Sequence, residues 1–135
     1  MNQKPSLAFI AASWIALGSG LVGFITGLSR AEMTLSEKGY YFTIILYGLF
    51  AVISVQKSVR DRLENIPVTD IYYGLSWFST IASIVLLTVG LWNSNLLPSE
   101  KGFYAFAFLL ALFGAISVQK NTRDTQNFNQ KNDNQ

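Results

Sequence analysis

Four long stretches without a charged residue alternate with short polar segments along the chain. The uncharged stretches cover residues 5–29, 39–56, 71–99 and 102–119. An α-helix rises about 1.5 Å per residue, so even the shorter of these stretches approach the ~30 Å hydrocarbon thickness of a bilayer. The pattern therefore predicts four membrane-spanning helices. They cover residues 6–29, 37–60, 70–92 and 100–122.

The second half of the chain repeats the first half at an offset of 63 residues. Residues 6–61 align without gaps on residues 69–124, with 20 identities in 56 positions. Ser6 falls opposite Thr69, and both residues are suitable helix N-caps. Each copy holds two predicted helices, so the copies face the same way and are related by an axis along the membrane normal. The sequence therefore predicts an all-α, four-helix transmembrane bundle of two tandem hairpins with the same orientation.

The two ends of the chain lead to separate expectations. The apolar stretch from Leu7 to Ser29 is longer than the ~7–15-residue core of a cleavable signal peptide. We therefore expect the first helix to remain as a spanning helix. The last segment, residues 125–135, has one aromatic and no aliphatic residue, so we expect a disordered polar tail.

Composition narrows the possible chemistry. The chain has no cysteine and no histidine, which excludes disulfides, thiolate nucleophiles, imidazole bases and Cys/His zinc sites. The net charge of +2 gives no basis for a nucleic-acid surface. The predicted spans also lack the embedded charges that membrane proteins retain mainly for transport or proton relay. The sequence therefore predicts no catalytic, cofactor-binding or metal-binding residue, and no enzyme.

Lysine and arginine are unevenly distributed between the two ends of the predicted helices. One end has seven of these residues and the other has three. The seven are Lys4, Lys57, Arg60, Arg62, Lys120, Arg123 and Lys131, and the three are Arg30, Lys38 and Lys101. Because positive residues remain on the cytoplasmic side, the bias predicts that both termini are cytoplasmic.

A repeated Ser-Glu-Lys-Gly motif begins the second helix of each copy. The residues are Ser36, Glu37, Lys38 and Gly39, and Ser99, Glu100, Lys101 and Gly102. Serine can cap a helix, glutamate suits its first turn, and glycine permits close backbone approach. One interpretation is a capped turn at the membrane interface. The alternative is that the two turns meet and form a small outer-face site.

A second repeated motif ends the same helices. The residues are Gln56, Lys57, Arg60 and Asp61, and Gln119, Lys120, Arg123 and Asp124. Aspartate is unfavourable at a helix C-terminus, and an i,i+4 pair with lysine contributes only a few tenths of a kcal/mol. We therefore expect pairing between the repeats, such as Arg60 with Asp124. A site for a partner or ligand and simple surface solvation remain as alternatives.

Small residues follow one face of the first predicted helix. The face comprises Ser19, Gly23 and Gly27, next to Ala12, Ala16 and Gly20. Such faces let helices approach closely in lipid. The first helix can therefore pack within the bundle or against another copy of the chain. Trp14 and Trp77 stand at equivalent positions within their helices, and we expect both to pack in the core.

These motifs resemble those of the YiaA/YiaB family of bacterial inner-membrane proteins. The resemblance rests on Trp14, Gly27-Leu28, the Glu-Lys-Gly-[Tyr/Phe]-Tyr pair and the Gln-Lys-x-x-Arg-Asp pair, and it covers about residues 6–124. The family is defined by a two-helix membrane domain, which is present here twice. The resemblance implies a location in the bacterial plasma membrane. It implies no agreed activity, cofactor or catalytic residue.

Three functions are compatible with these features. The first is a non-enzymatic packing or interaction module without a small-molecule ligand. Its expected partner is the bilayer, and a second copy of the chain is a further candidate. The second is passage of a small solute along the seam between the hairpins, suggested by the duplication and the hydroxyl-rich third helix. A membrane enzyme using Glu37 and Glu100 as acid and base comes last, because no nucleophile accompanies them.

Overall fold

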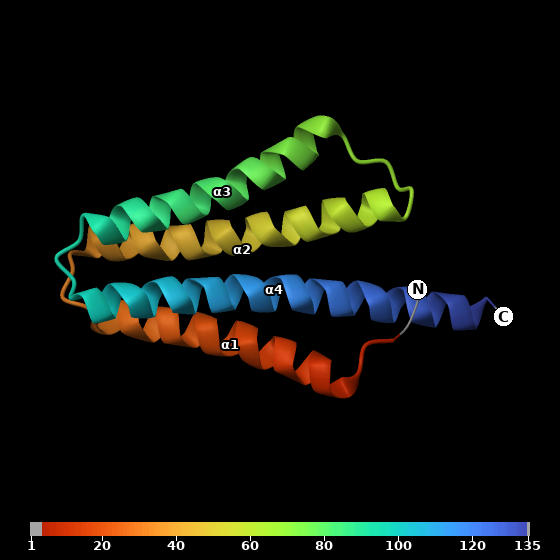
Figure 1. The fold of residues 1–135 in the computed structure, drawn as a ribbon, viewed down its shortest axis with the longest axis horizontal. Helices are drawn as coiled ribbons and strands as arrows, with labels where there is room; N and C mark the ends of the chain where they lie inside the picture. The colour runs from red at the N-terminus through yellow and green to blue at the C-terminus, as the bar shows by residue number, and fades with distance from the viewer. Residues whose placement is uncertain (1–3, 135) are drawn as a thin grey trace.

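The computed structural model describes residues 4–134, which form four α-helices joined by short loops (Figure 1). The helices are α1 (Leu7–Arg30), α2 (Leu35–Leu63), α3 (Asp70–Trp92) and α4 (Pro98–Asp133). Each is long and apolar enough to cross a membrane. The all-α, four-span prediction is therefore confirmed.

The helix starts agree with the sequence in one helix of each repeat and differ in the other. Ser6 and Thr69 cap α1 and α3 as predicted, each accepting a backbone N–H bond three residues ahead at 3.2 Å. Thr34 caps α2, and Pro98 begins α4, so the suggestion that Ser36 and Ser99 are caps is wrong. Proline favours this first helical position because its fixed φ suits a helix and no N–H is lost there.

The helices are arranged in the order α1, α4, α2, α3 across the molecule (Figure 1). The first helix of each repeat packs against the second helix of the other repeat: α1 against α4, and α3 against α2. The two second helices, α2 and α4, form the central contact. Each repeat is thus connected as a hairpin but makes most of its contacts with the other repeat.

Large buried side chains fill the central contact between α2 and α4. Ile45 and Phe108, which are equivalent in the two repeats, are both fully buried. The rings of Tyr41 and Tyr104, another equivalent pair, stack with their centres 6.4 Å apart. These contacts place the pseudo-twofold axis between α2 and α4, where equivalent residues meet.

The backbones of α1 and α4 approach closely at Gly20 and at Gly114, where an added Cβ would lie 2.3 Å from the Leu17 nitrogen. Gly20 is the contact on the α1 side. A Cβ atom at this position would lie 2.5 Å from the backbone nitrogen of Ala111, so only glycine fits. The alternative in which α1 packs within the bundle is therefore confirmed, and Gly20 of the predicted small-residue face lies at the contact. A Cβ at Gly23 or Gly27 would meet only aromatic side chains, at 3.5 and 3.0 Å, and Ser19 is exposed.

The two equivalent tryptophans lie on the outside of the protein. Trp14 is 57% exposed and Trp77 is 42% exposed, so the prediction that both pack in the core is wrong. In a membrane helix the surface residues face hydrocarbon, and lipid accommodates an indole ring as readily as a protein core does. Hydrophobicity alone therefore does not separate the packed face of such a helix from its lipid face.

The polar C-terminal segment continues α4 to Asp133, so the prediction of a disordered tail is wrong for the described part of residues 125–135. The segment contains no glycine or proline that would end a helix. Its first turn is also held by Asn127, whose side-chain nitrogen donates to the Glu64 carboxylate at 2.8 Å. This contact adds an anchor that composition alone does not reveal.

Candidate functional site

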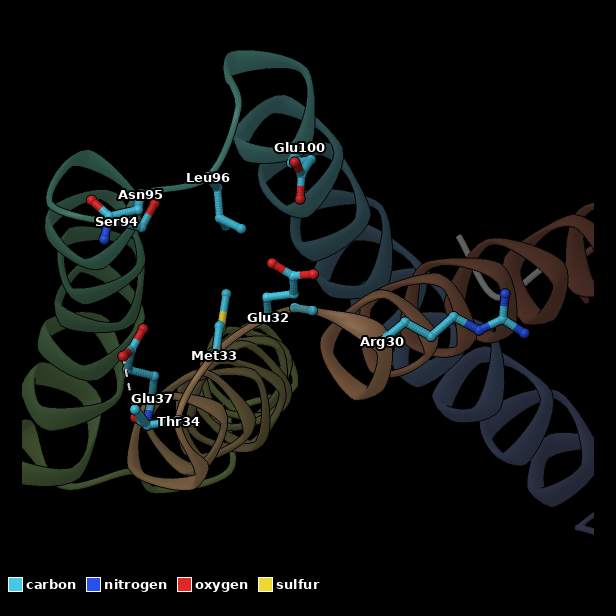
Figure 2. Close-up of a pocket in the computed structure, with 10 residues that line it drawn as sticks. Arg30, Glu32, Met33, Thr34, Glu37, Ser94, Asn95, Leu96 and Glu100 are labelled. Atoms are coloured by element: carbon cyan, nitrogen blue, oxygen red, sulfur yellow. Dashed lines mark hydrogen bonds between the residues drawn. The ribbon is translucent and has the colours of Figure 1, made fainter.

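A pocket of about 800 Å³ opens between the α1–α2 loop and the α3–α4 loop (Figure 2). We call it the loop pocket. It is lined by Arg30, Ala31, Glu32, Met33, Thr34, Glu37, Ser94, Asn95, Leu96 and Glu100. Because both repeats contribute residues, the two Ser-Glu-Lys-Gly turns do share one recess, as one of the two interpretations of that motif suggested.

Three carboxylates line the loop pocket. Glu32 and Glu100 point into it, while Glu37 lies beside Thr34 (Figure 2). The Thr34 hydroxyl donates to the Glu37 carboxylate at 3.1 Å, and the Thr34 oxygen accepts the Glu37 N–H. No ion pair within residues 4–134 involves these three glutamates. The pocket thus presents negative charge that the protein itself does not neutralise by direct contact.

The remaining residues of the predicted outer-face motif do not line the loop pocket. Lys38 turns away and donates to the Ser29 carbonyl at 3.2 Å, near the end of α1. Lys101 is absent from the lining. A Cβ at Gly39 or Gly102 would have nothing within 4 Å, so the expected close backbone approach at these glycines is wrong.

The motif analysis missed Glu32 as a lining residue. It stands in the α1–α2 loop outside the repeated motif, because its equivalent in the second repeat is Asn95. A carboxylate that is present in only one copy gives no repeat signal. No group of three or more acidic residues in the described chain is arranged to hold a metal ion.

The opposite end of α2 and α4 carries a network of ion pairs, which we call the charge cluster. Its core consists of Arg60, Asp61, Glu64, Arg123, Asp124 and Asn127, with Lys57 and Lys120 at its edge. Arg60 pairs with Asp124, and Arg123 pairs with Asp61. The predicted pairing of Arg60 with Asp124 is therefore present, together with its symmetric counterpart.

Lysine supports each buried aspartate from within the same helix. Lys57 lies 2.7 Å from Asp61, and Lys120 lies 2.8 Å from Asp124. The Asp61 side chain is only 6% exposed, and two opposite charges compensate its burial. Gln56 and Gln119 are half-buried, and their side chains make no hydrogen bond within residues 4–134.

Glu64 breaks the symmetry of the charge cluster. It accepts from Arg60 at 2.7 Å, from Arg123 at 3.2 Å and from Asn127 at 2.8 Å. Burial disfavours the charged form of this carboxyl, but the hydrogen bonds from Asn127 and the two arginines outweigh it and hold the pKa of Glu64 below its ordinary value. Because Asn127 is the repeat equivalent of Glu64, this pair of equivalent positions has one carboxylate and one amide.

A smaller polar contact links α1 to α4 at the same end. The side-chain nitrogen of Asn121 donates to the Ser13 hydroxyl at 3.1 Å, and that hydroxyl donates to the Phe9 carbonyl at 2.8 Å. The amide oxygen of Asn121 is buried and has no hydrogen-bond partner among residues 4–134. This contact links α1 of the first repeat to α4 of the second repeat, outside the central contact between α2 and α4.

Comparison with known proteins agrees with the duplicated architecture. The family model described as "yiaA/B two helix domain" matches residues 9–61 and again residues 72–124. The chain is 57% identical to the inner membrane protein YiaA of Escherichia coli K12 over 127 residues, which is 92% of this chain and 88% of that protein.

A more distant relative matches one repeat only. The chain is 40% identical to the membrane protein YubF of Bacillus subtilis 168 over 57 residues, which is 42% of this chain and 66% of that protein. No solved structure matches the chain. With four apolar helices and membrane-protein relatives, this is a multi-pass membrane protein. The chain belongs to the YiaA/YiaB family, whose two-helix domain it carries twice.

Proposed function

We propose that the chain is a non-enzymatic interaction module of the bacterial inner membrane, with both termini and the charge cluster in the cytoplasm. The loop pocket then faces outward. The observation that carries the proposal is the contrast between a solidly packed seam and an open pocket at one end. The protein therefore offers a surface that a partner can contact. Its described helix core shows no path for a solute.

The packing of the seam disfavours the alternative of solute passage. Ile45 and Phe108 are fully buried between α2 and α4, and buried residues of all four helices form one hydrophobic core cluster. Four of the five serine and threonine hydroxyl groups of α3 that suggested a path are also occupied. Ser76, Thr80, Ser83 and Thr88 each donate to a carbonyl three or four residues earlier in α3.

The loop pocket is the part of this surface that suits a partner. Its three carboxylates favour a partner that brings positive charge, because opposite charges steer association. We keep the non-enzymatic assignment because the sequence supplies neither an imidazole nor a thiol to act with these carboxylates.

Single-cysteine crosslinking in native membranes tests the proposal. The chain has no cysteine of its own, so Asn95→Cys places one thiol in the loop pocket and Val22→Cys places one on the apolar surface of α1. We expect Asn95→Cys to crosslink a partner more strongly than Val22→Cys. A chain that stayed free of partners at Asn95 would remove the interaction function.

Two further measurements test the rest of the proposal. Reconstituted vesicles should show no solute flux above empty vesicles, and measurable flux would restore the alternative. A membrane-impermeant maleimide should label Asn95→Cys in intact cells but not Asn132→Cys, near the end of α4. The opposite labelling pattern would reverse the proposed orientation.

A further inference from the structure

We propose that the two repeats are a built-in heterotypic pair: the first helix of each repeat is fitted to the second helix of the other, and each repeat recognises the other in preference to a copy of itself. This inference concerns the partner that each repeat fits, and it is independent of the proposed function. Four pairs of equivalent positions carry it: one pair on α1 and α3, two pairs in the central seam and one pair in the charge cluster.

The first pair shows that α1 and α3 are not interchangeable. Gly20 lies against the α4 backbone, where an added Cβ would come within 2.5 Å of the Ala111 nitrogen and 2.7 Å of the Ala107 oxygen. The equivalent residue of α3 is Ser83, which is fully buried against other neighbours. If α3 packed on α4 of its own repeat in the same way, the Ser83 Cβ would collide with backbone that cannot move aside. The residue at this position therefore opposes pairing within one repeat.

Two further pairs distinguish the repeats at the central seam, where α2 packs against α4. The Phe108 ring of α4 lies over Gly48 of α2, and a Cβ at Gly48 would be 2.8 Å from its tip. The equivalent positions on the other side of the axis are Ile45 and Ala111, both fully buried. A large residue thus opposes glycine on one side, while a smaller residue opposes alanine on the other. Two copies of the second repeat would force Phe108 onto Ala111, and two copies of the first would leave space between Ile45 and Gly48.

The last pair, in the charge cluster, distinguishes the repeats by charge. Glu64 and Asn127 are equivalent residues that touch each other at the axis, at 2.8 Å. Two copies of the first repeat would bring two glutamates together at this point, and like charges in contact are unfavourable. Two copies of the second would replace the carboxylate that accepts from Arg123. Steric fit and charge therefore both favour pairing of the first repeat with the second.

A matched pair of substitutions on α1 tests the exchange of first helices. Gly20→Ser copies the α3 residue into α1, and Gly18→Ser makes the same change where a Cβ has nothing within 4 Å. We expect Gly20→Ser to lower the melting temperature in detergent by roughly 5 °C or more, and Gly18→Ser to leave it unchanged. Equal effects of the two variants would overturn the fitted contact.

A compensating exchange tests the central seam. Gly48→Ala alone should be destabilising by a similar shift because Phe108 fills the space. Adding Phe108→Ile should recover part of the loss. The fourfold variant I45F/G48A/F108I/A111G moves the large residue to the other side of the axis and should melt close to the wild type. If this variant is no more stable than Gly48→Ala, the seam is not a fitted pair.

Cysteine pairs in the full chain test the helix arrangement without relying on a destabilised variant. Ser13 and Asn121 are in contact between α1 and α4, whereas Ser58 is the residue equivalent to Asn121 in the repeat of Ser13. All three positions are buried, so thiols that remain unlinked are labelled after the treated protein has been denatured. A short bifunctional thiol reagent should link S13C/N121C and protect both thiols from this labelling, and it should leave the thiols of S13C/S58C free to be labelled. Linkage of S13C/S58C in place of S13C/N121C would show that each repeat packs on itself.

Discussion

The two ends of α2 and α4 carry repeated charged motifs of similar composition, but their surroundings differ. In the charge cluster, arginines of each repeat pair with aspartates of the other. At the loop pocket, Glu37 and Glu100 line a cavity and form no ion pair within the described chain. The same duplication therefore gives mutual compensation at one end and uncompensated charge at the other.

The difference follows from how closely the repeats approach at each end. In the charge cluster α2 and α4 are near enough for Glu64 and Asn127 to touch across the axis. At the other end the two loops separate the helix starts, and the space between them is the loop pocket. A repeated motif becomes an internal contact only where it lies near the pseudo-twofold axis.

The largest effect that this comparison predicts is the loss of an arginine from the charge cluster. Arg123→Gln removes one of the two cationic partners of Asp61 and one partner of Glu64. Breaking a largely buried ion pair costs several kcal/mol when the remaining charge is unpaired, and here other cations remain nearby. We expect about 2–3 kcal/mol of destabilisation, measured by thermal unfolding in detergent.

Arg30→Gln is the matched control at the other end. Arg30 borders the loop pocket but points away from it (Figure 2), so its loss should change stability by no more than about 0.5 kcal/mol. Equal losses from the two variants would remove the energetic distinction between the ends.

A smaller effect is expected when an asparagine is converted to the glutamate of the first repeat. Asn127→Glu places a second carboxylate against Glu64, and we expect about 1–2 kcal/mol of destabilisation because a donor becomes a like charge. Asn95→Glu is the matched change in the loop pocket, because it replaces an asparagine of the second repeat by the glutamate of the first. Solvent and distance should limit its cost to about 0.5 kcal/mol. Similar unfolding temperatures for the two variants would contradict this order.

Several features could be predicted from the sequence because they depend on length, periodic spacing or local caps. The four spans follow from uncharged stretches that match the bilayer thickness. The Arg60–Asp124 pair follows from acids placed where their own helix does not favour them. In each case the sequence pattern is compatible with one physically favourable structure.

The helix order and the lipid-facing surfaces could not be predicted in the same way. In lipid, apolar side chains are suited both to the packed face and to the lipid face of a helix. Hydrophobicity therefore did not separate the exposed Trp14 from the buried Phe24. The lining residue Glu32 was missed because its repeat equivalent is Asn95, and the helical tail depends on a contact with Glu64.

A still smaller effect concerns the pH dependence of stability. The pKa of Glu64 is lowered in the folded protein by the hydrogen bonds from Asn127 and the two arginines, which outweigh burial. The folded state therefore holds this proton less tightly than the unfolded chain does. The stabilisation is present above the ordinary glutamate pKa of about 4.3 and is lost as the pH falls through the folded value.

Unfolding of the wild type and Glu64→Gln across this acidic range measures the contribution. We expect the wild type to lose more stability than Glu64→Gln as the pH falls through the folded pKa of Glu64. Parallel pH profiles would show that Glu64 adds nothing to the stability of the charge cluster.

The smallest effect on folding is expected at the loop pocket itself. The triple variant E32Q/E37Q/E100Q removes all three carboxylates that line it but no ion pair. Its unfolding free energy should therefore stay within about 0.5 kcal/mol of the wild type. The same variant should lose crosslinking from Asn95→Cys if a cationic partner binds there. Loss of crosslinking without loss of stability would show that the loop pocket serves partner binding, whereas the charge cluster stabilises the fold. A large drop in stability would mean that the three carboxylates support the fold.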